Sequence, residues 1–241
     1  SSAASDVYKR QVKYLGEVRI VPEVIGDRIY VASKSSLYML SGNGTIRSIS
    51  LPNIISLASW EGNIVANVLS NASSHLHIYD DSLNYLGSID VGFVVDYIDE
   101  ADIDGDNIKE LVVASLSSGL VTVYDDSSGG YNVILNASLG LQSYEEISTM
   151  PAIGDVDNDG LDEILFPILI VGVTLKGSNI IVLNGTGAIN RMNFSEAIQS
   201  IGMHDFNSDG SLDILIGYRY GLLAIDYATN TTLFHVSTKG I

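Results

Sequence analysis

The sequence of 241 residues contains no cysteine, which excludes thiol catalysis, cysteine-ligated zinc and a disulfide framework. Basic residues are also few, because 12 Lys and Arg stand against 29 Asp and Glu and give a formal net charge of −17. An acidic surface repels phosphate backbones, so nucleic acid is not an expected partner. The absence of cysteine leaves the cellular compartment open, since a large core needs no disulfides.

Long apolar runs are lacking as well. The most apolar stretch, residues 164–175, is about half the roughly 20 residues that a membrane-spanning helix requires, and it contains Pro167. No transmembrane segment is therefore expected. Residues 1–6 hold no apolar signal core, so we expect that a targeting peptide has been removed or never existed.

Helical periodicity is nearly absent, and residues 194–201 are the one segment expected to hold a helical turn. Short runs rich in Val, Ile, Leu and Tyr instead alternate with Gly, Asn, Asp and Ser clusters, which is typical of an all-β protein. The clearest predicted strands are residues 28–32, 36–40, 64–69, 75–80, 110–115, 120–124, 164–170, 179–183, 214–218 and 222–227.

One unit of roughly 45 residues recurs five times along the chain. Its apolar starts are Ile29, Ile64, Leu111, Ile164 and Ile214. Five such units, each preceded by its own short strand, match the four-stranded blades of a β-propeller better than the longer pattern of a sandwich. We predict a single propeller domain over residues 1–241, with approximate blades at 16–50, 51–90, 91–140, 145–195 and 196–241.

A closed propeller must join its ends. The strand-like residues 12–21 and 232–237 could do so by completing the last blade from both termini. The alternative is a ring that is closed by another chain.

Three segments share one acidic spacing, in which oxygen-bearing side chains stand at positions 1, 3, 5 and 9 of a loop that runs into an apolar strand. Ca²⁺ takes six to eight oxygen ligands, and a backbone carbonyl at position 7 would add one more. The predicted ligands are Asp102, Asp104, Asp106, Ile108 and Glu110; Asp155, Asp157, Asp159, Leu161 and Glu163; and Asp205, Asn207, Asp209, Ser211 and Asp213.

Position 6 of these loops requires a left-handed turn, which Gly160 and Gly210 adopt without penalty and Asn107 tolerates. An EF-hand would need a Glu at position 12 between helices, where this sequence has Val113, Phe166 and Ile216. Three copies of the loop favour cation binding over solvated turns.

Residues 151–165 and 202–217 resemble the FG-GAP/VCBS repeats of integrin-alpha-like β-propellers, and the resemblance extends from about Asp96 to the C-terminus. It implies that about three structural Ca²⁺ ions pin successive strands of the last three blades through the residues at positions 1, 3, 5, 7 and 9, with no catalysis. The first loop departs from the pattern at Gly105 and Asn107, and Glu110 and Glu163 stand where Asp is usual. Residues 29–40 and 221–226 look instead like quinoprotein-type propeller repeats.

Six Asn-x-Ser/Thr sequons lie in predicted turns or edges and favour a secreted, glycosylated protein. Asn-Gly also marks hairpin turns, which is a purely structural explanation for two of them, Asn43 and Asn184. The candidate glycosylation sites are Asn43, Asn71, Asn136, Asn184, Asn193 and Asn230.

The sequence therefore predicts an extracellular or cell-surface, calcium-stabilised β-propeller that acts as a non-catalytic interaction or adhesion module or as a subunit of a surface assembly. Three bound ions would change the formal charge from −17 to about −11. The expected ligand is a protein partner or a second copy, with glycans as a further candidate, and no residue is assigned a catalytic role. The alternatives are a secreted polysaccharide lyase or glycosidase and a lectin.

Each class has its own structural signature. Acids that converge at the blade axis, or a Tyr paired with a base there, would favour the enzyme. Repeated aromatic pockets would favour the lectin, and an apolar patch on the outer wall would favour the interaction module.

Overall fold

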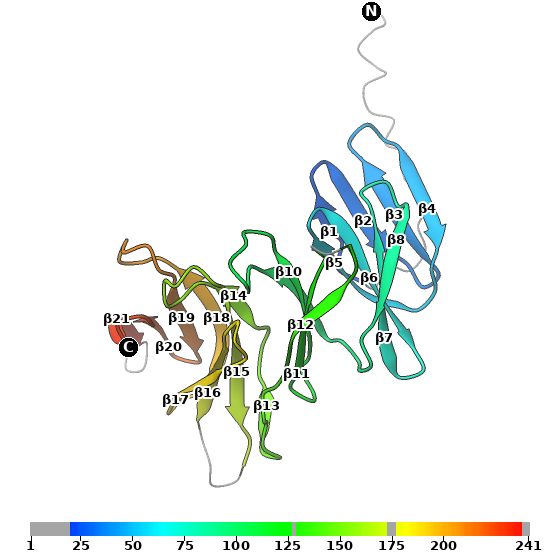
Figure 1. Cartoon of the computed structure of the whole chain (residues 1–241). Coiled ribbons are helices and arrows are strands. Elements are labelled where there is room, and N and C mark those ends of the chain that lie inside the picture. Colours follow the sequence, from blue (N-terminus) through cyan, green and yellow to red (C-terminus); the bar gives the residue numbers. More distant parts are fainter. Residues whose placement is uncertain (1–19, 127–128, 173–176, 238–241) are drawn as a thin grey trace, which may run out of the picture.

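The computed structural model describes residues 20–126, 129–172 and 177–237. Their regular structure consists of 21 strands in five antiparallel sheets (Figure 1). The predicted all-β class is confirmed. Within the described residues, no helix is long and apolar enough to cross a membrane.

Each sheet is built from consecutive strands of the chain. The first contains β1 (Glu23–Ile25), β2 (Arg28–Ala32), β3 (Ser36–Ser41) and β4 (Ile46–Ser50). The second contains β5 (Ile54–Trp60), β6 (Asn63–Ser70), β7 (Ser73–Tyr79) and β8 (Tyr85–Asp90). The third contains β9 (Tyr97–Ala101), β10 (Glu110–Ser115), β11 (Leu120–Asp125) and β12 (Asn132–Ser138).

The fourth sheet has a divided first strand, because both β13 (Glu145–Ile147) and β14 (Ala152–Gly154) pair with β15 (Glu163–Ile170). It continues with β16 (Ser178–Leu183) and β17 (Ile189–Phe194). The fifth sheet contains β18 (Ile198–His204), β19 (Asp213–Tyr218), β20 (Gly221–Asp226) and β21 (Thr231–Ser237). The helical turn expected over residues 194–201 is wrong, since Ile198 already pairs with Tyr218 of the neighbouring strand.

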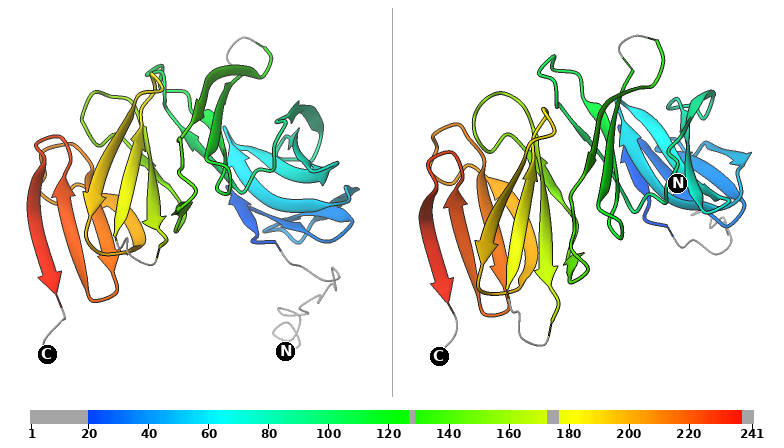
Figure 2. Two further views of the ribbon diagram at one scale, coloured as in Figure 1. Left: turned by 90° about the horizontal axis from the view of Figure 1, so that it is seen from below. Right: turned by 60° about the horizontal axis from the view of Figure 1, so that its bottom comes forward.

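The sheets follow one another around an arc, with the first and the fifth at opposite ends (Figure 2). Their first strands lie on the inner side, where β5 contacts β1 and β9, and β18 contacts β14. The fifth sheet draws its four strands from residues 198–237 alone. Residues 12–19 of the strand expected to complete it lie outside the described residues.

The hydrophobic core lies between successive sheets. Side chains alternate across the two faces of each strand, so neighbouring residues serve different interfaces. Val113, for example, packs in the cluster between the second and third sheets, whereas Val112 packs in the cluster between the third and fourth. The second, third and fourth sheets are therefore covered on both faces.

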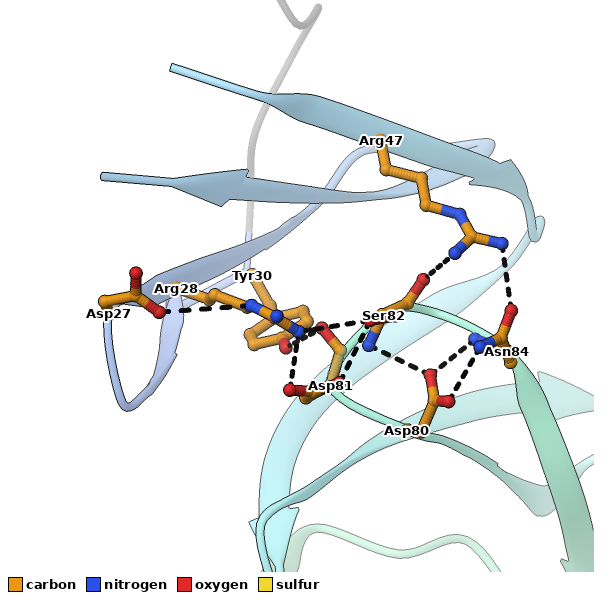
Figure 3. A network of polar contacts seen from close by, with 8 residues as sticks. All are labelled: Asp27, Arg28, Tyr30, Arg47, Asp80, Asp81, Ser82 and Asn84. Carbon is orange, nitrogen blue, oxygen red and sulfur yellow. Dashed lines mark hydrogen bonds and ion pairs between the residues drawn. The ribbon is translucent and has the colours of Figure 1, made fainter. Parts of the chain in front are cut away.

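Polar contacts connect strands β2 and β4 of the first sheet to the β7–β8 turn of the second (Figure 3). The guanidinium of Arg28 lies 2.7 Å from a carboxylate oxygen of Asp81, and the Tyr30 hydroxyl donates to the Asp81 carbonyl at 2.7 Å. Arg47 donates to the Asn84 side chain at 3.1 Å. These bonds hold the β7–β8 turn against the first sheet.

Candidate metal centres

The three acidic loops occupy equivalent places in the last three sheets, between β9 and β10, β14 and β15, and β18 and β19. In each loop, position 1 directly follows the first strand and position 9 opens the second. The loops are therefore equivalent connections between the first and second strands of successive sheets.

The position-1 carboxylate closes each loop by accepting two backbone N–H groups. In the second loop, Asp155 Oδ1 accepts from Asn158 at 2.6 Å and Oδ2 accepts from Gly160 at 3.0 Å. The corresponding residues of the other two loops, Asp102 and Asp205, make the same pair of bonds to positions 4 and 6. The side chain at position 1 thus organises the whole turn.

The position-5 carboxylate also accepts a backbone N–H of its loop, but only that of position 7 in all three loops. Asp106, Asp159 and Asp209 each accept the N–H of position 7, at 2.8, 2.9 and 2.9 Å. The predicted position-7 residues are accordingly held beside the carboxylates through their N–H groups. Coordination of a cation by their carbonyl oxygens stays a prediction.

The position-9 carboxylate is the buried component of each site. Glu110, Glu163 and Asp213 are at most 1% exposed. One oxygen of each accepts the N–H of position 2, at 2.7 Å for Glu110, 3.1 Å for Glu163 and 2.7 Å for Asp213. The other oxygen of Glu163, Oε1, and that of Asp213, Oδ1, are buried and accept no hydrogen bond from a described residue.

Buried oxygens without a partner are costly, and a bound cation would satisfy them. In the first two loops the carboxylates of positions 1, 3 and 9 also converge, with one oxygen from each within 4.8 Å of the others. The residues that converge are Asp102, Asp104 and Glu110 in one loop and Asp155, Asp157 and Glu163 in the other. These acidic clusters, each with one buried carboxylate, could hold a metal ion, and their all-oxygen donor set fits Ca²⁺.

The electrostatics of these two clusters agree with that assignment. Burial raises the pKa of Glu110 and of Glu163 to about 7, and the neighbouring Asp carboxylates also act to raise it, against the lowering effect of the N–H bond from position 2. The pKa of Asp157 is raised as well, by partial desolvation and by the neighbouring Asp159 and Asp155 carboxylates. The carboxylates crowd one another in the absence of a counter-charge.

Contacts between loops connect neighbouring sheets. The N–H of Asp162, at position 8 of the second loop, donates to the Asp102 carbonyl at 2.7 Å, and its carboxylate accepts the Asp102 N–H at 3.0 Å. The N–H of Leu212, at position 8 of the third loop, donates to the Asp155 carbonyl at 3.0 Å. Position 1 of one loop is thus bonded to position 8 of the next.

The first loop makes an equivalent contact to the second sheet, which has no acidic loop. Lys109 at position 8 donates its N–H to the Glu61 carboxylate at 3.0 Å and accepts the indole N–H of Trp60 at 2.7 Å. No local pattern in the sequence indicates Glu61 or Asp162, because such contacts join residues that are 48 or 60 positions apart.

Solved structures resemble this arrangement, although no family model and no curated protein matches the sequence. A structure described as dihydro-heme d1 dehydrogenase NirN shares 13% identity at a TM-score of 0.57, covering 91% of this chain and 47% of that one. The exotype rhamnogalacturonan lyase YesX shares 16% identity at 0.57, covering 87% and 43%, and the Dos1 propeller shares 11% at 0.56, covering 88% and 59%. The fold is a β-propeller.

The five sheets are therefore the blades of a propeller, and the chain spans about half the length of the structures that it resembles. At this level of identity the likeness concerns the fold alone. The FG-GAP/VCBS resemblance of the last three blades stays a prediction from the sequence.

One polar cluster lies on the inner side of the propeller and contains none of the predicted metal ligands. A cleft of about 240 Å³ is lined by Glu23, Ser59 and Asp99 from the first strands of three blades. The Tyr97 hydroxyl donates to Asp99 at 2.7 Å, and burial raises the pKa of both Glu23 and Tyr97. No sequence motif indicated this group, because its members come from separate blades.

Five of the six sequon asparagines are exposed, and Asn184 is partly buried. Asn136 and Asn193 lie in β12 and β17, the outermost strands of their blades, and the other four lie in turns. Asn184 Oδ1 accepts two N–H groups of its own turn. Glycans could be accommodated at the five exposed positions.

Proposed function

We propose that the protein is an extracellular, glycosylated β-propeller whose last three blades are stabilised by calcium and which acts as a non-catalytic interaction or adhesion module. The observation that carries the proposal is the pair of buried, unpartnered oxygens on Glu163 and Asp213, each at position 9 of an acidic loop. A cation bound at each loop supplies the positive counter-charge that these carboxylates lack. It also joins the first strand of a blade to its second.

Exposed apolar side chains on two outermost strands support the interaction role. Tyr85 and Leu86 at the start of β8 are 56% and 51% exposed, and Val133 and Ile134 in β12 are 53% and 40% exposed. These strands are the outermost of the second and third blades, which places the four side chains on the outer wall. Exposed apolar side chains on the outer wall suit contact with a protein partner or with a second copy of the chain.

The test is native mass spectrometry and a thermal melt of the protein purified from its source, each before and after chelation. We expect a mass that carries three Ca²⁺ ions and glycan increments, and a melting temperature that falls by several degrees in chelator, because calcium binds the folded loops and not the unfolded chain. An unchanged melt and a metal-free mass would overturn the calcium proposal. A mass without glycan would overturn the glycosylation proposal.

A second candidate function is a polysaccharide-active enzyme, and the Tyr97–Asp99–Glu23 cluster favours it because a tyrosine and two carboxylates meet on the inner side of the blades. The rhamnogalacturonan lyases YesX and YesW are among the structures with this fold. Incubation with rhamnogalacturonan would test it. Release of unsaturated or reducing ends that Asp99→Asn abolishes would favour the enzyme, and no release would remove it for this substrate.

A lectin is not favoured by the described residues. The single Trp, Trp60, is 1% exposed and cannot stack on a sugar. The most exposed aromatic side chains, Tyr85, Tyr144 and Tyr220, occupy different positions in their blades rather than one repeated pocket.

A further inference from the structure

The third acidic loop differs from the other two in its carboxylates. Loops one and two carry an acidic side chain at each of positions 1, 3, 5 and 9, whereas the third has an amide, Asn207, at position 3. A site with one carboxylate fewer neutralises less of the charge of a divalent cation, and ligand charge is one factor that sets calcium affinity.

A carboxylate from another turn of the same blade lies beside that amide. Asp226, the last residue of β20, is 3% exposed, and its Oδ2 lies 3.3 Å from the Asn207 amide nitrogen, which donates to it. The same amide nitrogen donates to Asp209 at 2.8 Å, and Asn207 Oδ1 accepts the Asp209 N–H at 3.0 Å. Asp226 is therefore in contact with the position-3 side chain.

Asp226 also closes the β20–β21 turn, a role that an amide oxygen fills in the fourth blade. Asp226 Oδ1 accepts the N–H of Thr229 at 2.9 Å, and the Thr229 hydroxyl donates to Oδ2 at 2.5 Å. In the fourth blade, Asn184 occupies the equivalent place after β16 and closes its turn with an amide oxygen, accepting from Thr186 and Ala188 at 3.1 and 2.9 Å. An uncharged oxygen is thus sufficient to close the turn at this place in the fourth blade.

The two blades differ in a reciprocal manner. The fourth blade has Asp157 at position 3 and Asn184 in the turn, and the fifth has Asn207 at position 3 and Asp226 in the turn. Among the described residues, Asp226 forms no ion pair with Lys, Arg or His. Asp226 is thus hydrogen-bonded but lacks a counter-charge, which is costly for a buried carboxylate. Asp213 Oδ1 in the same blade is buried and accepts no hydrogen bond from a described residue.

We propose that Asp226 is the fourth carboxylate of the third metal centre, contributed by the β20–β21 turn in place of a position-3 acid. It stabilises the cation by its charge and orients the Asn207 amide by accepting its N–H, which leaves Oδ1 toward the loop. This inference rests on the proposed calcium binding and assigns to the site a residue that lies outside the acidic loop.

The test is calorimetric titration of Ca²⁺ into chelator-stripped protein carrying Asp226→Asn, a change that preserves the size of the side chain and an oxygen for the turn. We expect about tenfold to hundredfold weaker binding of one ion and unchanged binding of the others, the range typical when a residue that supports a metal ligand is lost. The matched control is Asp80→Asn. Asp80 also closes the turn after the third strand of its blade, by accepting two N–H groups of the β7–β8 turn at 2.9 and 2.8 Å, and this blade has no acidic loop.

Two further variants make the assignment specific. The double variant Asn207→Asp with Asp226→Asn moves the carboxylate into the loop, as in the fourth blade, and should restore the affinity of wild type. In an Asp205→Ala background, which removes the third site, Asp226→Asn should have no further effect on the remaining ions.

The outcomes separate this inference from the proposed function. If wild type and Asp80→Asn bind no calcium, the proposed function fails. If both bind calcium and Asp226→Asn binds it identically, only the role of Asp226 fails. A loss of affinity in Asp226→Asn that persists in the Asp205→Ala background would also overturn it, since the effect would then not belong to the third site.

Discussion

A single side chain at position 1 determines the path of each acidic loop, and it imposes two left-handed residues rather than one. Its two oxygens accept the N–H groups of positions 4 and 6, and both positions have positive φ in all three loops. The expected left-handed turn at position 6 is confirmed at Asn107, Gly160 and Gly210. The left-handed position 4, occupied by Asn158 and Ser208 as well as by Gly105, was not expected, because only glycine signals this conformation clearly in a sequence.

Replacement of Gly160 by Ala isolates the cost of this conformation. Gly160 has a φ of 89°, and a Cβ added to it would meet nothing within 4 Å, so the effect arises from backbone strain alone. We expect Gly160→Ala to lower the free energy of unfolding by about 1–2 kcal/mol in urea titrations. Gly202→Ala is the control, because its Cβ also has open space and its φ is not positive. Equal stability of the two variants would contradict the conclusion that position 6 requires a left-handed conformation that strains residues other than glycine.

The strand elements of the second blade contain a natural reporter of the first acidic loop. Trp60 is the only Trp of the chain, ends β5, and donates its indole N–H to the carbonyl of Lys109, at position 8 of that loop. Its ring also packs against Tyr131, with the centroids 5.6 Å apart. The first loop is thus hydrogen-bonded to a buried fluorophore of the neighbouring blade.

We therefore expect calcium added to chelator-stripped protein to change the Trp60 fluorescence. Asp104→Ala, which removes a predicted ligand of the first loop, should abolish this change. Asn207→Ala, which alters only the third loop, should leave it in place, and this variant is the control. A fluorescence response that is lost equally in both variants would show that Trp60 does not report on the first loop.

At the scale of the whole molecule, the acidic loops are confined to three blades of five. The bonds from position 1 of one loop to position 8 of the next join the third, fourth and fifth blades, whereas the first and second blades are joined by the polar contacts of Arg28 and Arg47 with the β7–β8 turn (Figure 3). Calcium should therefore stabilise one part of the arc more than the other.

Hydrogen exchange measured by mass spectrometry would test this asymmetry. On chelation we expect faster amide exchange in strands β9 to β20, because the loops lose the ions that hold adjacent strands together, and little change in β2, β3, β6 and β7. Exchange that accelerates uniformly across all five blades would contradict a local role for calcium and indicate a global loss of stability.

Much of the architecture follows from the sequence. All ten predicted strands coincide with β2, β3, β6, β7, β10, β11, β15, β16, β19 and β20, which are the two central strands of each blade. Strands such as β10 and β16 are buried on both faces and so appear as continuous apolar runs. The outermost strands were less evident, because β12 and β17 are largely exposed and lack such a run.

The sequence by itself also determined the spacing of the acidic loops, since each loop is a local turn whose ligands are at most eight positions apart. Only the tertiary structure decided which buried oxygens stay unpartnered, that Asp226 lies beside Asn207, and that Tyr97, Asp99 and Glu23 share one side of the propeller. The physical reason is that such contacts depend on the pairing of strands and the packing of blades. These bring together residues far apart in the chain, whose proximity no local pattern encodes.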